Sequence, residues 1–389
     1  MKILVLATKC PWPAQDGGRL ALWLTLQGLA RAGHRLWLVA PVASPAEADT
    51  LMAAADLRAV CTPLLVPVPP HPWPRAAWRS LLTGRALTVE RHALDAVAQA
   101  VAACVAEVQP ALIHVEQLQA YANAHAGAAA AVPKLLRMQN VESGLWRQMA
   151  SLTRPWFAWE ARRVQRDEGR ALASAAQVLA LTGSDRDLLQ RACPGGTEVR
   201  AIPPPFPSTL PAAAAQPGTP AVVVFGSQDW RPNREAIGWF LEAVLPALQA
   251  QCPDAVVHLY GHSGRAPPGV VVHPAPVDAI EAFPADAVMA LPLRIASGIR
   301  MRILEACARG LPVVASSVAV RGLALRDGEE LLIADSAADF VDALRRLSEP
   351  GLRARLVDAG RAYLRRWHDE ARCTEDLLAA YADALQAPR

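Results

Sequence analysis

One stretch in the second half of the sequence combines residue types that suit a phosphorylated ligand. Ser297 is a favourable N-cap for a helix that Gly310 would end. Gly298 would let a ligand approach the first-turn amides, where the helix dipole favours phosphate. Arg302 and Glu305 are three residues apart and share one helix face, which offers a guanidinium for a diphosphate and a carboxylate for ribose hydroxyls. The alternative from the same spacing is a surface helix with an Arg–Glu ion pair.

A pair of glycines near the N-terminus is the second candidate. Gly17 and Gly18 follow an apolar run, residues 2–7, and precede a helical pattern. Paired glycines allow positive φ and the close approach of a phosphate or a sugar. The alternative is an ordinary turn between a strand and a helix.

A histidine and a glutamate end a central apolar run of the first half. His114 and Glu116 are two residues apart, so they point to the same side of a continuing strand. They could contact the acceptor or the sugar, or His114 could be a satisfied core histidine. The histidines show no metal-ligand spacing, and the 7 cysteines form no C-x-x-C motif. The sequence therefore predicts neither a metal site nor a disulfide framework, and it favours a reducing cytoplasm.

Length and composition set the scale of the fold that must position these residues. At about 150 residues per domain, 389 residues predict two domains. The chain is 52% hydrophobic and 19% charged, which is typical of a globular protein. A net charge of +3 is too small to predict a nucleic-acid partner. No apolar run reaches the ~18 residues of a membrane span, and the first strand is too short for a signal-peptide core.

Strand and helix patterns alternate along both halves, which predicts an α/β protein with parallel sheets. In the first half, strands are expected at residues 2–7, 35–40, 111–115, 134–138, 177–181 and 198–202, with helices at 19–32, 93–108, 155–175 and 185–193. In the second half, strands are expected at 221–226, 256–260, 270–273, 286–291, 312–315 and 330–333, with helices at 233–250, 336–348, 351–366 and 370–386.

The expected boundary between the halves is rich in proline and alanine. We predict an N-terminal Rossmann-like domain at 1–203, a linker at 204–220, a second Rossmann-like domain at 221–368 and a C-terminal helix at 369–389. Ligands of open parallel sheets bind at the carboxyl ends of the strands. Two facing sheets therefore predict a site in the cleft between them.

The stretch around residue 300 resembles the nucleotide-sugar signature of glycosyltransferase family 4, which has the two-domain GT-B fold. The matching residues are Arg302, Glu305, Ala306, Ala308, Gly310, Pro312, Val313 and Val314. Segments 11–19, 140–143, 182–187 and 225–233 resemble other family motifs in the same order. The similarity is to a branch found in bacterial exopolysaccharide and capsule loci.

The resemblance implies a retaining, metal-independent hexosyltransferase that uses a nucleotide-diphosphate sugar as co-substrate, with no further cofactor. UDP-sugar is the first expectation and GDP-sugar the second. The resemblance also implies that residues 1–203 form the acceptor domain, that residues 221–368 form the nucleotide-sugar-binding domain, and that the helix at 369–389 crosses back to the first domain. The acceptor would be a glycan or a lipid-linked glycan for surface polysaccharide, at the inner face of the cytoplasmic membrane. The implied catalytic residues are His114, Glu116 and Arg302. The implied donor-binding residues are Gly17, Gly18, Arg231, Asn233, Ser297, Gly298, Ile299, Arg300, Arg302 and Glu305.

Some positions depart from the family pattern. Ser297 stands where many members have the first of two glutamates, and Glu116 replaces the second histidine of a His-x-His. The usual arginine and lysine pair after the second-domain glycine is absent, with Asn233 near that place and Arg231 or Arg294 as substitute cations. Two alternatives therefore stand beside the transferase: a degenerate protein that binds a nucleotide-sugar or a partner transferase without turnover, and a nucleotide-sugar epimerase.

Two first-half stretches, residues 73–92 and 145–163, are both basic and aromatic. They could dock on anionic lipid headgroups, or they could be amphipathic helices with buried tryptophans and solvated arginines. For residues 155–170 the sequence favours the second interpretation, because Glu160, Asp167 and Glu168 offset the arginines. For residues 73–92 both interpretations stay open.

Overall fold

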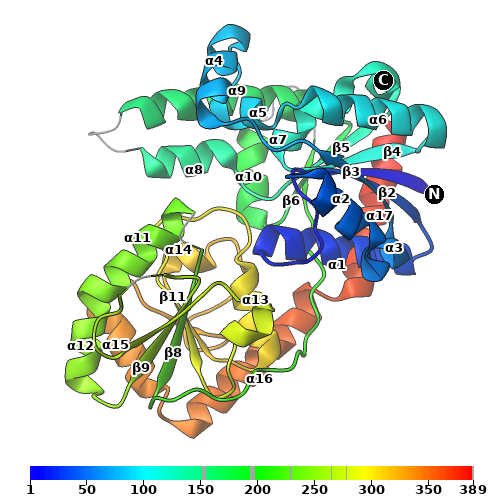
Figure 1. Cartoon of the computed structure of the whole chain (residues 1–389). Helices are drawn as coiled ribbons and strands as arrows, with labels where there is room; N and C mark the ends of the chain where they lie inside the picture. Colours follow the sequence, from blue (N-terminus) through cyan, green and yellow to red (C-terminus); the bar gives the residue numbers. More distant parts are fainter. Residues whose placement is uncertain (151–154, 193–197, 228–229, 264, 277, 388–389) are drawn as a thin grey trace. The chain divides into compact units, whose positions relative to one another are not determined.

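A computed structural model describes residues 1–150, 155–192, 198–227, 230–263, 265–276 and 278–387. The chain divides into two compact units (Figure 1). The first unit comprises Met1–Pro205, Ser297–Ile299 and Glu370–Arg389. The second unit comprises Phe206–Ala296 and Arg300–Asp369.

The first unit is built on a parallel sheet with the strand order β3-β2-β1-β4-β5-β6-β7 over the described residues. Its strands are β1 Lys2–Leu6, β2 Arg35–Val42, β3 Thr62–Pro67, β4 Leu112–Glu116, β5 Lys134–Met138, β6 Gln177–Ala180 and β7 Val199–Ala201. Its helices are α1 Gly17–Arg31, α2 Pro45–Ala53, α3 Ala55–Val60, α4 Trp73–Thr83, α5 Leu87–His92, α6 Asp95–Val108, α7 Leu118–Tyr121, α8 Glu142–Met149, α9 Pro155–Ser174, α10 Gly183–Ala192 and α17 Glu370–Gln386.

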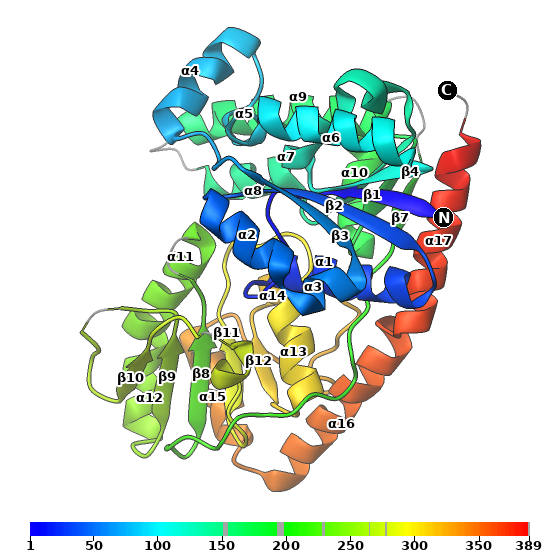
Figure 2. The same cartoon turned by 45° about the vertical axis from the view of Figure 1, so that its right-hand side comes forward.

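Apolar side chains on both faces of this sheet explain its two layers of helices. Leu4 and Leu6 join one core cluster, which contains residues of α6 and α9, while Ile3 and Val5 join a second cluster with residues of α1 and α17. This alternation follows from the two-residue period of a strand and is typical of a sheet buried on both sides. Figure 2 shows the two layers of the first unit, with α6 and α9 on one face and α1 and α17 on the other.

The second unit is built on a smaller parallel sheet, whose strand order within the described part of the chain is β10-β9-β8-β11-β12-β13. Its strands are β8 Ala221–Phe225, β9 Val256–Tyr260, β10 Val270–His273, β11 Val288–Leu291, β12 Val313–Ala315 and β13 Leu332–Ile333. Its helices are α11 Arg231–Trp239, α12 Leu245–Gln251, α13 Met301–Arg309, α14 Ser317–Val320, α15 Ala337–Arg346 and α16 Pro350–Trp367.

The prediction of two successive Rossmann-like parallel sheets is confirmed. The helix expected at 233–250 is broken into α11, a π-helical turn at Phe240–Val244, and α12. Pro246 lies in the first turn of α12, and its missing N–H explains why the regular ladder is interrupted there. Helices α2 and α3 and strand β3 were not expected from the sequence, whereas α4 and α5 lie in the stretch 73–92, for which amphipathic helices were one of the two interpretations. Across the described residues, no helix is both long and apolar enough to span a bilayer.

Candidate functional site

Helix α13 begins at Met301, so the predicted N-cap at Ser297 is wrong. Gly298 has φ of +72°, and the cap residue is Arg300 with φ −90° and ψ 84°. A residue in the left-handed region cannot continue a right-handed helix, which therefore starts later. No side chain caps α13. Its first-turn amides are therefore at an end that the dipole makes attractive to an anion.

Arg302, on the first turn of α13, lies at the carboxyl end of β8. Its guanidinium carbon is 4.2 Å from the ring centroid of Phe225, the last residue of that strand. The aromatic ring therefore holds a positive charge at the edge of the sheet where open α/β folds bind their ligands.

Glu305 lies one turn further along α13 and is 5% exposed. Its Oε1 accepts hydrogen bonds from Arg309 Nε and Nη2 at 3.0 and 2.9 Å. Burial raises the pKa of Glu305, although the Arg309 guanidinium opposes this shift. The Arg–Glu pair expected on a surface helix is therefore a buried pair, made with Arg309 rather than with Arg302.

Arg300 is buried against the chain that follows β12. Its Nε donates to the carbonyl of Ala319 at 2.6 Å, and Nη2 donates to the carbonyl of Arg321. These bonds fix the start of α13 relative to α14. Ser297 and Ile299 flank Gly298, and all three group with the first unit.

Asn233 shapes the turn after β8. It is buried, and its Nδ2 donates to the carbonyl of Ser227 at 3.1 Å. A Cβ on Gly226 would lie 2.9 Å from Asn233 Cγ, so only glycine leaves room for this packing. Arg231 is the partly exposed first residue of α11, and Arg294 lies 4.0 Å from Glu235.

Gly17 and Gly18 form the first turn of α1, whose N-cap Asp16 accepts from Arg19 N. Neither glycine has positive φ, so that part of the prediction is wrong. Glycine is needed at position 18 because there is no room for a side chain. A Cβ there would lie 2.6 Å from Gln139 Oε1, and its carbonyl accepts from Gln139 Nε2 at 3.2 Å.

His114 and Glu116 lie inside the first unit and are 1% and 2% exposed. Glu116 accepts from Arg137 Nε at 2.9 Å and from Gln139 Nε2 at 2.8 Å, while His114 Nε2 lies 3.1 Å from Glu116 Oε2. His114 Nδ1 lies 2.5 Å from Tyr381 Oη. Burial raises the pKa of Glu116, but Arg137 and the hydrogen bonds outweigh it and lower the pKa below its usual range. Burial also lowers the pKa of His114, which favours a neutral ring.

Gln139 connects this buried cluster to the glycine turn, because the same amide nitrogen reaches both Glu116 and the Gly18 carbonyl. Sequence reasoning missed Arg137 and Tyr381 entirely. Alternation along β5, which places Arg137 opposite Glu116, was a signal that could have found the first. Tyr381 is 267 residues from His114, and no local pattern reveals such a pairing.

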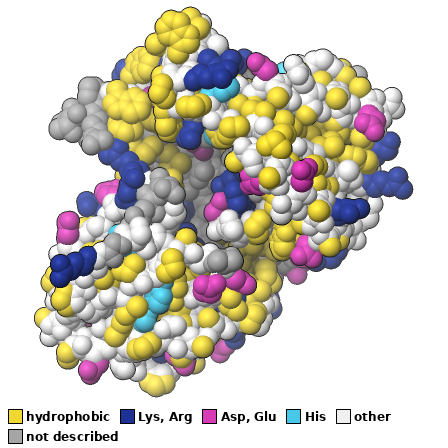
Figure 3. Space-filling model, in the orientation of Figure 1, with side chains coloured by type: hydrophobic (Ala, Val, Ile, Leu, Met, Phe, Trp, Pro, Cys, Tyr) yellow, Lys and Arg dark blue, Asp and Glu magenta, His cyan; other side chains and the backbone are white. Residues whose placement is uncertain are grey.

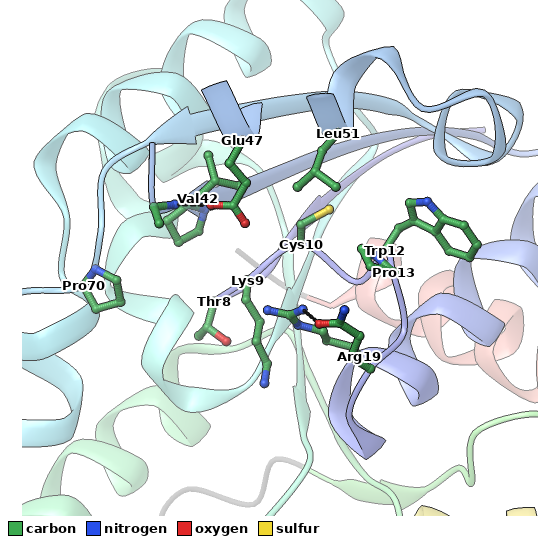
Figure 4. A pocket seen from close by; sticks show the side chains of 13 residues that line it. Thr8, Lys9, Cys10, Trp12, Pro13, Arg19, Val42, Glu47, Leu51 and Pro70 are labelled. Atoms are coloured by element: carbon green, nitrogen blue, oxygen red, sulfur yellow. Dashed lines mark hydrogen bonds between the residues drawn. The ribbon is translucent and has the colours of Figure 1, made fainter. Parts of the chain in front are cut away.

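A pocket of about 370 Å³ lies where β1, β2 and β3 end (Figure 4). Its polar lining includes Lys9, Arg19 and Glu47, and Cys10 lies among them. Lys9 Nζ donates to Asp16 Oδ2 at 2.6 Å, so the N-cap of α1 also orients one wall. In the portion of the chain that the structure describes, no cluster of three or more His, Cys, Asp or Glu residues is arranged to hold a metal.

Two successive Rossmann-like sheets, the second with an uncapped helix at its ligand edge, define the GT-B class of glycosyltransferase folds. Sucrose-phosphate synthase from Thermosynechococcus elongatus has a similar fold, with 17% identity, 100% coverage of both chains and a TM-score of 0.77. TarM is similar at 8% identity, 98% coverage of both chains and a TM-score of 0.72. HepE from Anabaena, solved with UDP and glucose, has 16% identity, covers 98% of this chain and 99% of its own, and has a TM-score of 0.63.

The second unit gives the more specific match. Residues 219–349 fit the family model described as Glycosyl transferases group 1, so the predicted glycosyltransferase resemblance is confirmed. D-inositol 3-phosphate glycosyltransferase from Acidothermus cellulolyticus is 33% identical over 139 residues, which cover 35% of this chain and 31% of that protein. The matched family segment contains Arg231, Asn233, Arg302 and Glu305, whereas His114 and Glu116 lie outside it.

Proposed function

We propose that this protein is a retaining glycosyltransferase that uses a nucleotide-diphosphate sugar, with UDP-sugar as the favoured donor and GDP-sugar next. The observation that carries the proposal is the uncapped start of α13, with the Arg302 guanidinium beside Phe225. In the structures of HepE, UDP, glucose or UDP-glucose is bound to a similar fold, which supports a uridine donor.

In this proposal the donor diphosphate binds at the α13 amides, and Arg302 compensates its charge. The bond between the anomeric carbon and the diphosphate oxygen breaks, and the diphosphate leaves with the electron pair. The acceptor hydroxyl attacks the same face, its proton passes to the departing diphosphate oxygen, and the configuration is retained. A positioned cation and helix dipole stabilise the leaving group without requiring a metal. Glu305 accepts hydrogen bonds from the ribose hydroxyls.

We assign the acceptor, a glycan or a lipid-linked glycan of a surface polysaccharide, to the first unit. Its pocket lies at the carboxyl ends of β1 to β3, which is the ligand edge of an open parallel sheet. The burial of His114 and Glu116 supports a positioning role for both. In this role they fix the position of Gln139, which in turn fixes the turn at Gly18. The same turn places Gly17 next to the substrates.

The first test is thermal unfolding of the full chain with millimolar UDP, GDP, ADP or dTDP. A nucleotide at 100 times its Kd stabilises a protein by about 2.7 kcal/mol, so one nucleotide should raise Tm visibly. Glu305→Gln should reduce this response, because an amide accepts ribose hydrogen bonds less strongly than a carboxylate. Asp342→Asn, an exposed acid on α15, is the matched control and should keep it. Failure of every nucleotide to stabilise the folded wild type would remove the proposed donor site.

Binding without turnover is the second candidate, favoured by Ser297 at the position where many members carry a glutamate. Incubation with the sugar conjugate of the stabilising nucleotide separates the candidates. Release of free nucleoside diphosphate with acceptor glycans supports the transferase. Stabilisation without release supports the binding role, and an altered sugar without an acceptor indicates an epimerase.

A further inference from the structure

Helix α4 of the first unit has small residues on its buried side and large apolar residues on its exposed side, which is the reverse of a helix that packs on a core. Its inward residues, Ala76 and Ser80, are small and buried. Its outward residues are large and apolar, with Trp78 64% exposed and both Leu81 and Leu82 69% exposed. Isolated exposed hydrophobic residues are common, but a whole outward face of this kind indicates an interaction surface.

The inward side of α4 is fixed by polar contacts, which explains this orientation. Glu90 is fully buried beneath the helix and accepts from Arg79 Nε at 3.0 Å and from Thr83 Oγ1 at 2.8 Å. Arg163 Nη2, from α9, donates to the carbonyl of Ser80 at 2.6 Å. Rotating α4 to bury its leucines would remove Arg79 and Thr83 from the buried Glu90 carboxylate and leave it with Arg85 Nη1 at 3.4 Å, at a cost in free energy.

Helix α9 continues the same surface. Trp156 and Trp159 are 46% and 49% exposed, and the contact of Arg163 with Ser80 joins this helix to α4. This differs from the interpretation that the sequence favoured for residues 155–170, in which the tryptophans were buried. Residues 151–154 of the second basic stretch lie outside the described residues.

The acidic residues that were expected to offset the arginines of α9 point inward. Glu160, Asp167 and Glu168 are 0%, 7% and 1% exposed. Asp167 accepts from the Ala86 amide at 2.6 Å, and Glu168 accepts from the Glu142 amide at 2.9 Å. Arg162 and Arg166 remain exposed on α9, as does Arg75 on α4. The outward face is therefore basic as well as apolar.

We propose that this face is a membrane-docking surface for an anionic lipid bilayer. Its apolar part is formed by Trp73, Trp78, Leu81, Leu82, Trp156 and Trp159. Figure 3 shows hydrophobic side chains over α4 at the top of the view, with basic side chains beside them. Tryptophan and leucine beside arginine, with each acid of the two helices buried, match the composition of interfacial helices on anionic membranes.

Charge distinguishes this occupant from a second copy of the chain. A symmetric contact between two such faces would bring Arg75, Arg162 and Arg166 of one copy toward the same arginines of the other. Like charges at an interface disfavour association, whereas anionic lipid headgroups attract them. The proposal does not depend on glycosyl transfer, because vesicle binding is measured without donor or acceptor.

The test is flotation of the full chain with phosphatidylglycerol-containing vesicles and with purely phosphatidylcholine vesicles. The wild type should bind the first and bind the second at least about tenfold more weakly, and salt should weaken the binding. Trp78→Ser combined with Leu82→Ser should reduce binding about tenfold or more. Arg75→Gln combined with Arg162→Gln should reduce it about 25-fold, at about fivefold for each arginine.

The matched controls make the same kinds of substitution on helices outside the proposed docking surface. Leu188→Ser with Leu385→Ser removes exposed leucines from α10 and α17, and Arg58→Gln with Arg346→Gln removes exposed arginines from α3 and α15. Both controls should bind vesicles like the wild type, and circular dichroism should show native structure for every variant. Failure of the wild type to bind anionic vesicles, or equal loss in the controls, would overturn the proposal. So would a concentration-dependent dimer that the α4 variants abolish while vesicle binding persists, since the face would then join two copies.

Discussion

Two buried glutamates, one in each unit, show how differently the same side chain is used. Glu116 is 2% exposed and is bonded to Arg137, Gln139 and His114, and its pKa is lowered. Glu305 is 5% exposed and bonded to Arg309, and its pKa is raised because burial outweighs that partner. Burial alone therefore does not distinguish a structural carboxylate from one with capacity left for a ligand.

The two glutamates differ in the direction of their pKa shift. A carboxylate whose charge is more than compensated stabilises the fold as an anion. A carboxylate whose charge is under-compensated gains from further donors, such as ribose hydroxyls. The first unit thus holds a glutamate whose charge is compensated by its neighbours, and the second holds a glutamate whose cost of burial outweighs its partner.

The largest expected effect is the loss of Arg137. Arg137→Met should destabilise the protein by about 3–5 kcal/mol, because it leaves the Glu116 carboxylate buried without its main cation. Urea unfolding of the first unit measures this change. Adding Glu116→Leu should restore most of the lost stability, since an apolar pair replaces the ionic one. A double variant as unstable as the single one would show that Glu116 is not the partner that matters.

Loss of Arg309 should have a smaller effect that depends on pH. Arg309→Met should destabilise the second unit by about 2 kcal/mol at pH 7, because it removes two charge-assisted hydrogen bonds to Glu305. The folded-state pKa of Glu305 is already above its unfolded value, and the variant raises it further. The folded state then binds a proton more tightly, so stability falls as pH rises through the interval from the unfolded pKa, about 4.3, to the folded one.

The destabilisation of Arg309→Met should therefore shrink when unfolding is measured at pH 4 to 5 instead of pH 7. Arg345→Met removes an exposed arginine that pairs with Asp342, and it should change stability by less than about 1 kcal/mol at every pH. A destabilisation by Arg309→Met that is equal at pH 4 and pH 7 would contradict the raised pKa of Glu305.

The smallest expected effect is at the glycine turn that the Glu116 cluster supports. Gly18→Ala should be about 1 kcal/mol less stable than Gly183→Ala, since the new methyl group displaces Gln139, whereas nothing lies within 4 Å of a Cβ at Gly183. Thermal unfolding compares the two variants. In a Gln139→Ala background the difference should vanish, and its persistence there would exclude Gln139 as the obstacle.

Sequence patterns predicted most of the strands because parallel strands buried on both faces form continuous apolar runs, as in β1 and β8. They missed β3, which contains Pro63 and Pro67 and lies at the sheet edge, where a missing N–H is tolerated. They left two interpretations open for residues 73–92, because the exposed face of α4 carries the residues that periodicity assigns to a core.

The candidate site could be predicted where its residues lie close together in the sequence. Arg302 and Glu305 lie on one helix, and the resemblance named both. Glu305 and Arg309 are four residues apart, which is an ordinary spacing for an ion pair on a helix. Arg302 is three residues from the same glutamate, so the sequence does not indicate which arginine pairs with it. The backbone of Gly298 decides where α13 starts, and a glycine residue alone does not reveal the sign of its φ.

The position of helix α17 at the end of the first unit's sequence has a consequence for the order in which the two units fold. Tyr381, fully buried, closes the α1 face of the first sheet and reaches His114, yet the ribosome synthesises this helix after the whole second unit. The nascent first unit thus emerges with the apolar side of α1 uncovered. The second unit, whose strands β8 to β13 are consecutive in sequence, can fold during translation. The first unit completes its core only after helix α17 has emerged from the ribosome.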